Sequence, residues 1–140
     1  GLSFHFEYDG DSPGARCVRT WGDGGIHDHK LAYDAAARVT VVEDSYGHRT
    51  RYAANAAGLV TEVVDANGAV STFDYDAALR LVREVSTVGQ VTALTYDARG
   101  NCTAVTWPAG ATTTAAFDGD LCTAAVDLAG GRWAWTYDPA

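Results

Sequence analysis

Aspartates recur through the sequence at a regular spacing, and their carboxylates are the first candidates for chemistry. Asp34, Asp76, Asp97, Asp118 and Asp138 are separated by 42, 21, 21 and 20 residues. Paired carboxylates can act as general acid and base or bind calcium. An active site is needed once in a chain, however, whereas a turn is needed in every repeat. We therefore interpret these aspartates as turn residues and predict no catalytic residue and no enzyme activity.

A second candidate is the cluster His27, Asp28 and His29, with Asp23 nearby. Residues two apart on a strand share a face, so the two histidines could hold a metal ion together. No third ligand stands at a recognised spacing. We predict no metal site here and no cofactor for the chain.

The sequence gives even less support for a catalytic nucleophile. The sequence has no G-x-S-x-G motif and no Cys-His constellation with an orienting partner. Cys17, Cys102 and Cys122 are odd in number and lack C-x-x-C spacing, which predicts buried or half-buried free thiols rather than a disulfide framework or a zinc ribbon.

The overall charge excludes two classes of partner. The 140 residues carry 18 acidic and 10 basic side chains, a formal charge of -8, which argues against binding to nucleic acid or to an anionic membrane. No apolar run reaches membrane-spanning length, and GLSFHFEYDG has no signal-peptide pattern. Because the last element starts at Tyr137 and does not finish, we expect a segment of a longer chain.

The candidate aspartates belong to an internal repeat. Aromatic-acidic pairs recur at intervals of 20 to 25 residues, mostly 21, with Ala54-Asn55 at the one place that departs from the pattern. A column of turn glycines has the same 21-residue period. The pairs are Tyr8-Asp9, Tyr33-Asp34, Tyr75-Asp76, Tyr96-Asp97, Phe117-Asp118 and Tyr137-Asp138, and the glycines are Gly47, Gly68, Gly89, Gly110 and Gly131.

Within each repeat the pattern alternates and is rich in Val, Thr, Tyr, Phe and Trp, which predicts strands. The aromatic of each pair shares a strand face with the residue two positions earlier, such as Phe73 before Tyr75. The second strand of each repeat begins with a column that we assign to Val39, Val60, Leu81, Cys102 and Thr123.

The turns between strands are predicted from their end residues. The aspartate of a pair opens a type I turn, and a glycine such as Gly100 closes it where positive φ is needed. Ala37, Leu79 and Leu121 stand where that glycine is missing, so each turn either carries a left-handed residue that costs about 1 kcal/mol or differs in form. A longer loop is expected at residues 9–15.

The fold class is therefore all-β: tandem β-hairpins of about 21 residues in a curved, spiralling antiparallel sheet. The chain is one repeat segment with no second domain. Such a sheet cannot bury its own faces, so we expect it to act as a wall. The units are assigned to residues 4–25, 26–47, 48–68, 69–89, 90–110, 111–131 and, in part, 132–140.

These repeats resemble the YD repeats of the Rhs (rearrangement hotspot) family. Residues 68–76 and 89–97 approximate the G-x-x-x-x-Y-x-Y-D sequence pattern of these repeats. Residues 4–34 are similar to the Rhs core of bacterial polymorphic toxins. The resemblance implies a hollow β-cocoon that encloses a C-terminal toxin domain. Asp138-Pro139 superficially resembles the family's self-cleavage signature, but it occupies an ordinary pair position, so we assign no cleavage to it.

The resemblance also implies a function. It predicts a non-catalytic shell segment whose partners are the rest of its own shell, the enclosed toxin domain and a secretion spike protein. The protein would be made in the bacterial cytoplasm and exported by a type VI system for interbacterial competition. The alternative is a secreted or cell-surface module that binds carbohydrate through Trp107, Trp133 and Trp135.

Overall fold

The computed structural model describes residues 1–138, and the chain divides into two units, Gly1–Ser71 and a second that begins at Thr72. All secondary-structure elements longer than three residues are β-strands, as the alternating sequence pattern predicts. Two 3-10 segments of three residues, η1 and η2, are rim turns, and in the described chain no helix is long and apolar enough to cross a membrane. Pro139 and the end of the last predicted unit lie outside the described residues.

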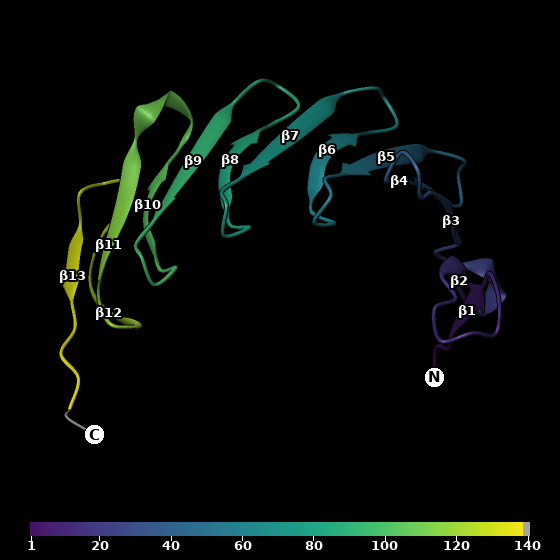
Figure 1. Ribbon diagram of the computed structural model, residues 1–140, viewed down its shortest axis with the longest axis horizontal. Helices are drawn as coiled ribbons and strands as arrows, with labels where there is room; N and C mark the ends of the chain where they lie inside the picture. The colour runs from purple at the N-terminus through teal and green to yellow at the C-terminus, as the bar shows by residue number, and fades with distance from the viewer. Residues whose placement is uncertain (139–140) are drawn as a thin grey trace. The chain divides into compact units, whose positions relative to one another are not determined.

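The first unit contains strands that pair antiparallel in chain order (Figure 1). The elements are β1 (Phe4–Tyr8), β2 (Cys17–Gly22), η1 (Asp23–Gly25), β3 (His29–Asp34), β4 (Val39–Glu43), β5 (Arg49–Ala54) and β6 (Val60–Val64). The gap between β1 and β2 confirms the longer loop expected after Asp9.

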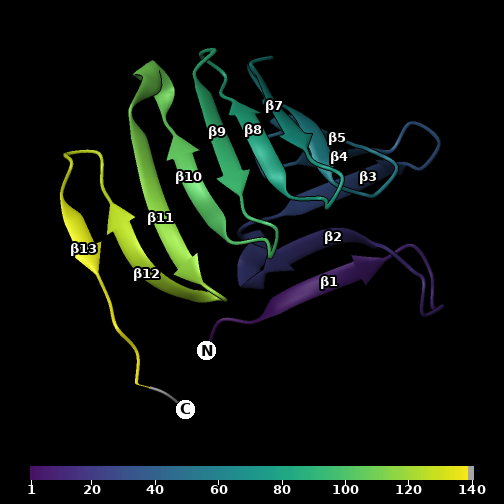
Figure 2. The ribbon, with the colours of Figure 1, turned by 60° about the vertical axis from the view of Figure 1, so that its left-hand side comes forward.

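The second unit is built in the same way. Figure 2 shows β8 to β12 as successive antiparallel neighbours, each hairpin followed directly by the next. Its elements are β7 (Val70–Tyr75, whose first two residues belong to the first unit), β8 (Leu81–Val85), β9 (Val91–Tyr96), β10 (Cys102–Thr106), η2 (Pro108–Gly110), β11 (Thr112–Asp118), β12 (Leu121–Val126) and β13 (Arg132–Ala134). The prediction of tandem antiparallel hairpins is confirmed.

Neither unit has a buried core. Along β3 and β11 half-buried and exposed residues alternate strictly, and the aromatic of each pair, Tyr33 or Phe117, is on the less exposed face. Within the described residues no hydrophobic side chain is fully buried, while Phe6 and Trp133 remain 58% and 49% exposed. Hydrogen bonding within each hairpin, rather than a two-layer core, therefore orders the strands.

The turns at both rims share one geometry. In each standard turn the first residue accepts a hydrogen bond from the backbone N–H three residues later and donates its own N–H to the carbonyl four residues later, as for Asp65 with Gly68 and Ala69. The residue three after the first has positive φ, which glycine adopts without steric cost. Leu79 adopts it as well, with φ of 64°.

At the other two positions without glycine the turn differs. After Asp34 the left-handed residue is Arg38, one position later than expected, and β3 and β4 pair without the bulge that precedes the other pair positions. After Asp118 the turn is one residue shorter, with Gly119 at φ of 62°.

The shorter turn corrects two assignments. Phe117 pairs with Cys122, as Tyr96 pairs with Cys102, so Cys122 rather than Thr123 belongs to the column at the start of the second strand. The turn glycine of that repeat is Gly130, with φ of 81°, and not Gly131. A constant 21-residue spacing placed both assignments one residue too late.

Candidate functional site: the network around the YD pairs

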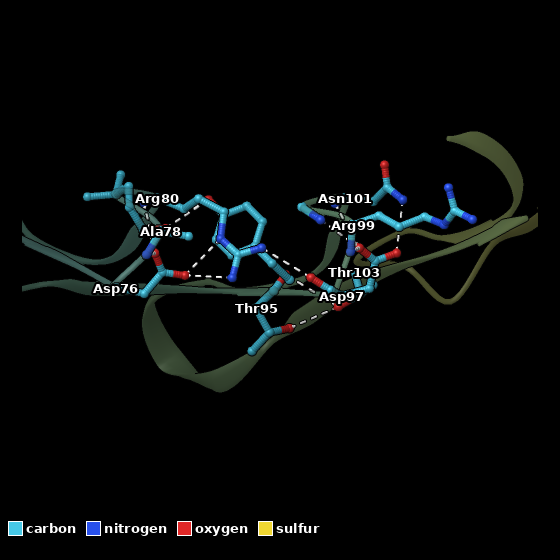
Figure 3. Close-up of polar contacts among 11 residues, drawn as sticks. Asp76, Ala78, Arg80, Thr95, Asp97, Arg99, Asn101 and Thr103 are labelled. Atoms are coloured by element: carbon cyan, nitrogen blue, oxygen red, sulfur yellow. Dashed lines mark hydrogen bonds and ion pairs between the residues drawn. The ribbon is translucent and has the colours of Figure 1, made fainter. Parts of the chain in front are cut away.

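The aspartate of a YD pair organises its own turn. Asp76 Oδ1 accepts the backbone N–H of Ala78 at 2.9 Å and that of Arg80 at 3.0 Å (Figure 3). Asp97 Oδ1 accepts three backbone N–H groups, from Arg99, Gly100 and Asn101, each at 2.9 Å. These bonds satisfy backbone donors that the turn would otherwise leave open, as the predicted role of the pair required.

The side chain four residues after the aspartate joins one hairpin to the next. Arg80 places Nε 2.8 Å and Nη2 2.7 Å from Asp76 Oδ2, and its Nη1 donates to the carbonyl of Asp97 at 3.1 Å. Figure 3 shows the guanidinium extending between the two turns. Asn101 repeats the arrangement, because its Nδ2 donates to Asp97 Oδ2 at 2.9 Å and to the carbonyl of Gly119 at 2.8 Å.

The tyrosine of a pair joins the same hairpins in the opposite direction. Tyr96 donates its hydroxyl proton to the carbonyl of Leu81 at 2.8 Å, while the guanidinium of Arg80 lies 4.7 Å from the centre of its ring. Tyr33 and Tyr137 donate in the same way to the carbonyls of Cys17 and Cys122, each at 2.7 Å. Leu81 and Cys17 are the first residues of β8 and β2, and Cys122 is the second residue of β12.

The electrostatics of the network follow from these contacts. The backbone N–H and the guanidinium of Arg80 lower the pKa of Asp76, and hydrogen bonds from Asn101, first from its side chain, lower the pKa of Asp97. Partial burial raises the pKa of Tyr96. At neutral pH Asp76 and Asp97 are thus charged acceptors and Tyr96 is a neutral donor, which suits a structural network.

The other predicted pairs use parts of the same network. Asp9 Oδ1 accepts the N–H of Arg16 at 2.7 Å, and the guanidinium of Arg16 lies 4.9 Å from the ring centre of Tyr33. Tyr8 is 55% exposed on β1. Phe117 has no hydroxyl to donate, and the turn after Asp118 is the shortened one. Asp138 is an exposed residue after β13.

Sequence reasoning missed the residue that follows the turn. Arg16, Arg80 and Asn101 each stand immediately before the second strand, where a basic or amide side chain can reach both aspartate and neighbouring hairpin. For Arg80 and Asn101 the signal was present in the sequence as an Asp-x-x-x-Arg or Asp-x-x-x-Asn motif, whereas Arg16 follows Asp9 by seven residues. The signal is weak because Leu59 and Leu121 occupy the corresponding positions elsewhere.

Cys102 was predicted to belong to the column at the start of the second strand, but Cys17 and Cys122 were missed as its equivalents. Each stands at the start of a second strand and directs its thiol to the carbonyl two residues later, at 3.4 Å for Cys17, 3.6 Å for Cys102 and 3.5 Å for Cys122. All three are free and half-buried. Their equivalence is hidden in the sequence by the long loop after Asp9 and the short turn after Asp118.

The residues of the predicted histidine cluster form hydrogen bonds and ion pairs with other parts of the chain. Arg19 forms a two-bond ion pair with Asp28, at 2.9 and 2.8 Å, and the Nδ1 atom of His29 lies 2.8 Å from the carbonyl of His27. Asp23 is 2.9 Å from Nε2 of His5. Over residues 1–138, no three His, Cys, Asp or Glu side chains come together in a way that could hold a metal ion.

The tryptophans make different local contacts. Trp21 lies between Arg19, 4.7 Å from its ring centre, and His5, whose ring stacks at 5.4 Å. The indole N–H of Trp107 points to Thr113 Oγ1 at 3.4 Å. Trp133 and Trp135 are on β13 and just beyond it, 49% and 44% exposed.

Comparison with known families agrees with this geometry. Residues 55–87 and 75–112 match the family model described as RHS Repeat. These stretches contain the turns opened by Asn55, Asp76 and Asp97. Outside them the standard turn recurs at Asp44 and Asp127, and the tyrosine hydroxyl contact recurs at Tyr33 and Tyr137. A comparison with curated proteins finds no match. Residues 55–112 therefore match the Rhs repeat, the family that the YD pattern of the sequence resembles.

Proposed function

We propose that this chain is a shell segment of an Rhs-type toxin, and that the complete shell encloses a C-terminal toxin domain until delivery. The observation that carries the proposal is a sheet with ordered rims and uncovered faces. Both rims are fixed by repeated turn bonds, yet no hydrophobic side chain among the described residues is fully buried. Such faces need something to pack against, and an enclosed domain together with further repeats would supply it.

The mechanism is confinement. A wall of this kind holds its cargo away from the cytoplasm of the producing cell and needs no reactive group of its own. The network supports that role, because the bonds from Arg80 and Tyr96 join consecutive hairpins rather than forming a pocket for a substrate. We further propose that the partners are the remaining shell, the enclosed domain and a secretion spike protein, with export by a type VI system.

The test uses the complete polypeptide that carries this chain. Residues 69–110, two whole repeats, are deleted, and protease resistance of the C-terminal domain and toxicity to the producing cell are measured. We expect the deletion to expose the domain to protease and to raise toxicity. As a control, Val88→Ser changes a turn residue that is 76% exposed and should leave both unchanged. Equal protection with and without the two repeats would refute confinement.

The carbohydrate-binding alternative predicts a different result. Binding of glycans by this chain that disappears in Trp133→Ala, with the protection of the C-terminal domain unaffected, would favour it. The exposure of Trp133 and Trp135 is the observation on which it rests.

A further inference from the structure

Three arginines in this protein are each held between a carboxylate and an aromatic ring. Arg80 pairs with Asp76 at 2.7 Å and lies 4.7 Å from the ring centre of Tyr96. Arg19 pairs with Asp28 at 2.8 Å and lies 4.7 Å from the ring centre of Trp21. This arrangement satisfies the charge of the guanidinium on one side and its flat, weakly hydrated face on the other.

The third example has looser geometry but the same parts. Arg16 Nε lies 3.5 Å from Asp9 Oδ2, and its guanidinium carbon lies 4.9 Å from the ring centre of Tyr33. The arrangement is therefore a recurring way in which this chain binds its own arginines, twice immediately before a second strand and once on β2.

A fourth carboxylate and aromatic ring stand together at β12 and β13 without a cation. Asp127 Oδ2 and Trp133 Cη2 lie 2.9 and 3.0 Å from the position that a Cβ atom on Gly131 would occupy, so the two groups are close neighbours. Oδ1 of Asp127 is committed to its turn, where it accepts the N–H of Ala129 at 2.8 Å and of Gly131 at 2.7 Å. Oδ2 has no such commitment.

No basic side chain in the described part of the chain forms an ion pair with Asp127. Arg132 is nearby in sequence, but it pairs in register with Val126 and forms no ion pair in the same region. The ring of Trp133 is 49% exposed, so one of its faces can be reached. Carboxylate and ring are both available to a cation from outside.

Asp127 and Trp133 also line one groove. Its volume is about 330 Å³, and its other walls come from β10, β11 and β12, including Val105, Ala115 and Ala125. Small apolar residues leave room for the aliphatic stem of a long side chain, and Asp127 is the one charged group in the lining. A largely apolar groove with a single carboxylate in its lining, alongside Thr103, Thr113 and Thr114, fits a side chain that is apolar along its stem and positive at its tip.

We propose that this groove binds an arginine side chain from a protein segment that packs on this face, with the guanidinium between Asp127 Oδ2 and Trp133. The chain's net charge of -8 favours such a basic partner. Glycine at position 131 belongs to the site, because a side chain there would meet both binding groups. The inference does not depend on confinement, since it concerns the chemistry of the contact and not where the partner resides.

The test measures binding of a short peptide to the 140-residue chain by NMR, with the indole N–H signal of Trp133 as the probe. The ligands are acetyl-Ala-Arg-Ala-amide and the same peptide with citrulline, which keeps the shape of arginine but is neutral. We expect saturable shifts of the Trp133 signal with the arginine peptide and about fivefold weaker binding of the citrulline peptide.

Substitutions separate this site from a general electrostatic effect. Asp127→Asn keeps the turn acceptor and should weaken binding about fivefold. Trp133→Leu should weaken binding to the same extent, whereas Trp133→Phe should retain most of it. Because both Trp133 variants lack the indole, their binding is followed through the backbone amide shifts of Asp127 and Gly131. Asp65→Asn changes an equivalent turn aspartate and should leave affinity unchanged. Backbone spectra of each variant show whether the fold is kept.

Two results would overturn the proposal. Equal affinity for the arginine and citrulline peptides, or equal loss in Asp65→Asn and Asp127→Asn, would show that no specific guanidinium site exists. Shifts of the Trp133 signal by a neutral saccharide that persist in Asp127→Asn, with none from the arginine peptide, would assign the groove to carbohydrate.

Discussion

Two junctions between hairpins show what a YD pair does. At the junction of Asp76 and Tyr96, the aspartate holds Arg80, Arg80 reaches the carbonyl of Asp97, and Tyr96 donates back to Leu81. At the junction that runs from Asp34 to Ala54, Asp34 accepts one backbone N–H, from Ala37 at 2.9 Å, and alanine stands in place of the aromatic.

Both junctions nevertheless form. The strands β4 and β5 pair over five residues, and the N–H of Ala54 donates to the carbonyl of Arg38 at 2.9 Å. At the opposite end of these strands Arg49 Nε lies 2.8 Å from Glu43 Oε2. The difference shows that a junction forms without the side-chain bonds of a YD pair at this rim, and that the YD pair adds bonds that fix the rim. The following predictions test how much those bonds contribute.

The largest expected effect comes from removing the tyrosine. Tyr96→Ala should lower the free energy of unfolding by about 2 kcal/mol, because it removes the ring packing, the contact with Arg80 and the hydrogen bond to Leu81. Tyr96→Phe, which loses only the hydrogen bond, should cost about 1 kcal/mol. Urea unfolding followed by circular dichroism measures both. A loss in Tyr96→Ala no greater than in Val88→Ala, at an exposed turn, would contradict the role of the pair.

The converse substitution should strengthen the weaker junction. Ala54→Tyr places a hydroxyl where it can reach the carbonyl of Val39, the counterpart of Leu81, and should raise the free energy of unfolding by up to about 1 kcal/mol. Ala54→Phe is the control that adds the ring without the hydroxyl. If the two variants are equally stable in urea, the hydroxyl bond is not what distinguishes the junctions.

A smaller effect is expected at the turn of the stronger junction. Leu79 has φ of 64°, a left-handed conformation that is unfavourable for any residue with a Cβ atom but not for glycine. Leu79→Gly should therefore stabilise the chain by roughly 0.5–1 kcal/mol. Ala78→Gly, at the preceding position of the same turn, only adds freedom to the unfolded chain and should destabilise it. Thermal unfolding compares them, and a shift of the same sign in both variants would refute the argument.

The smallest effect is the dependence of stability on pH, since the charges concerned are largely exposed and screened by solvent. The pKa of Asp76 is lowered in the folded chain, so its contribution is full above the unfolded pKa of about 3.9 and is lost as pH falls through the lower folded pKa. Wild-type stability should therefore fall more steeply below about pH 4 than that of Arg80→Met.

Urea midpoints between pH 2 and 7 measure this difference. Arg80→Lys keeps the positive charge and should follow the wild type more closely than Arg80→Met does. Parallel profiles for all three proteins would mean that the contact between Asp76 and Arg80 contributes nothing to folding.

Much of the fold could be predicted from the sequence because its determinants are local. The bonds that define a turn, such as those that Asp65 Oδ1 accepts from the N–H groups of Asn67 and Ala69, span at most four residues and recur at several turns, for example at Asp76 and Asp127. Alternation along β3 and β11 likewise depends only on strand geometry. The period, the hairpins and the turn function of the aspartates followed from these patterns.

The candidate site was harder to predict because its contacts cross between hairpins. Arg80 reaches Asp97 across 17 residues and Asn101 reaches Gly119 across 18, and neither distance follows from the repeat period. The pairing of Asp127 with Trp133 depends on the turn between β12 and β13 and on the absence of a side chain at Gly131.

The sequence by itself determined the repeat, the strands and the role of each turn aspartate, because those depend on contacts within a few residues of the chain. Only the tertiary structure decided that the turn after Asp118 is one residue short, which moves Cys122 and Gly130 into the positions that a fixed period gave to Thr123 and Gly131. The physical reason is that register is set by hydrogen bonding between neighbouring strands, and a ladder accommodates a shorter turn by shifting which residues are paired.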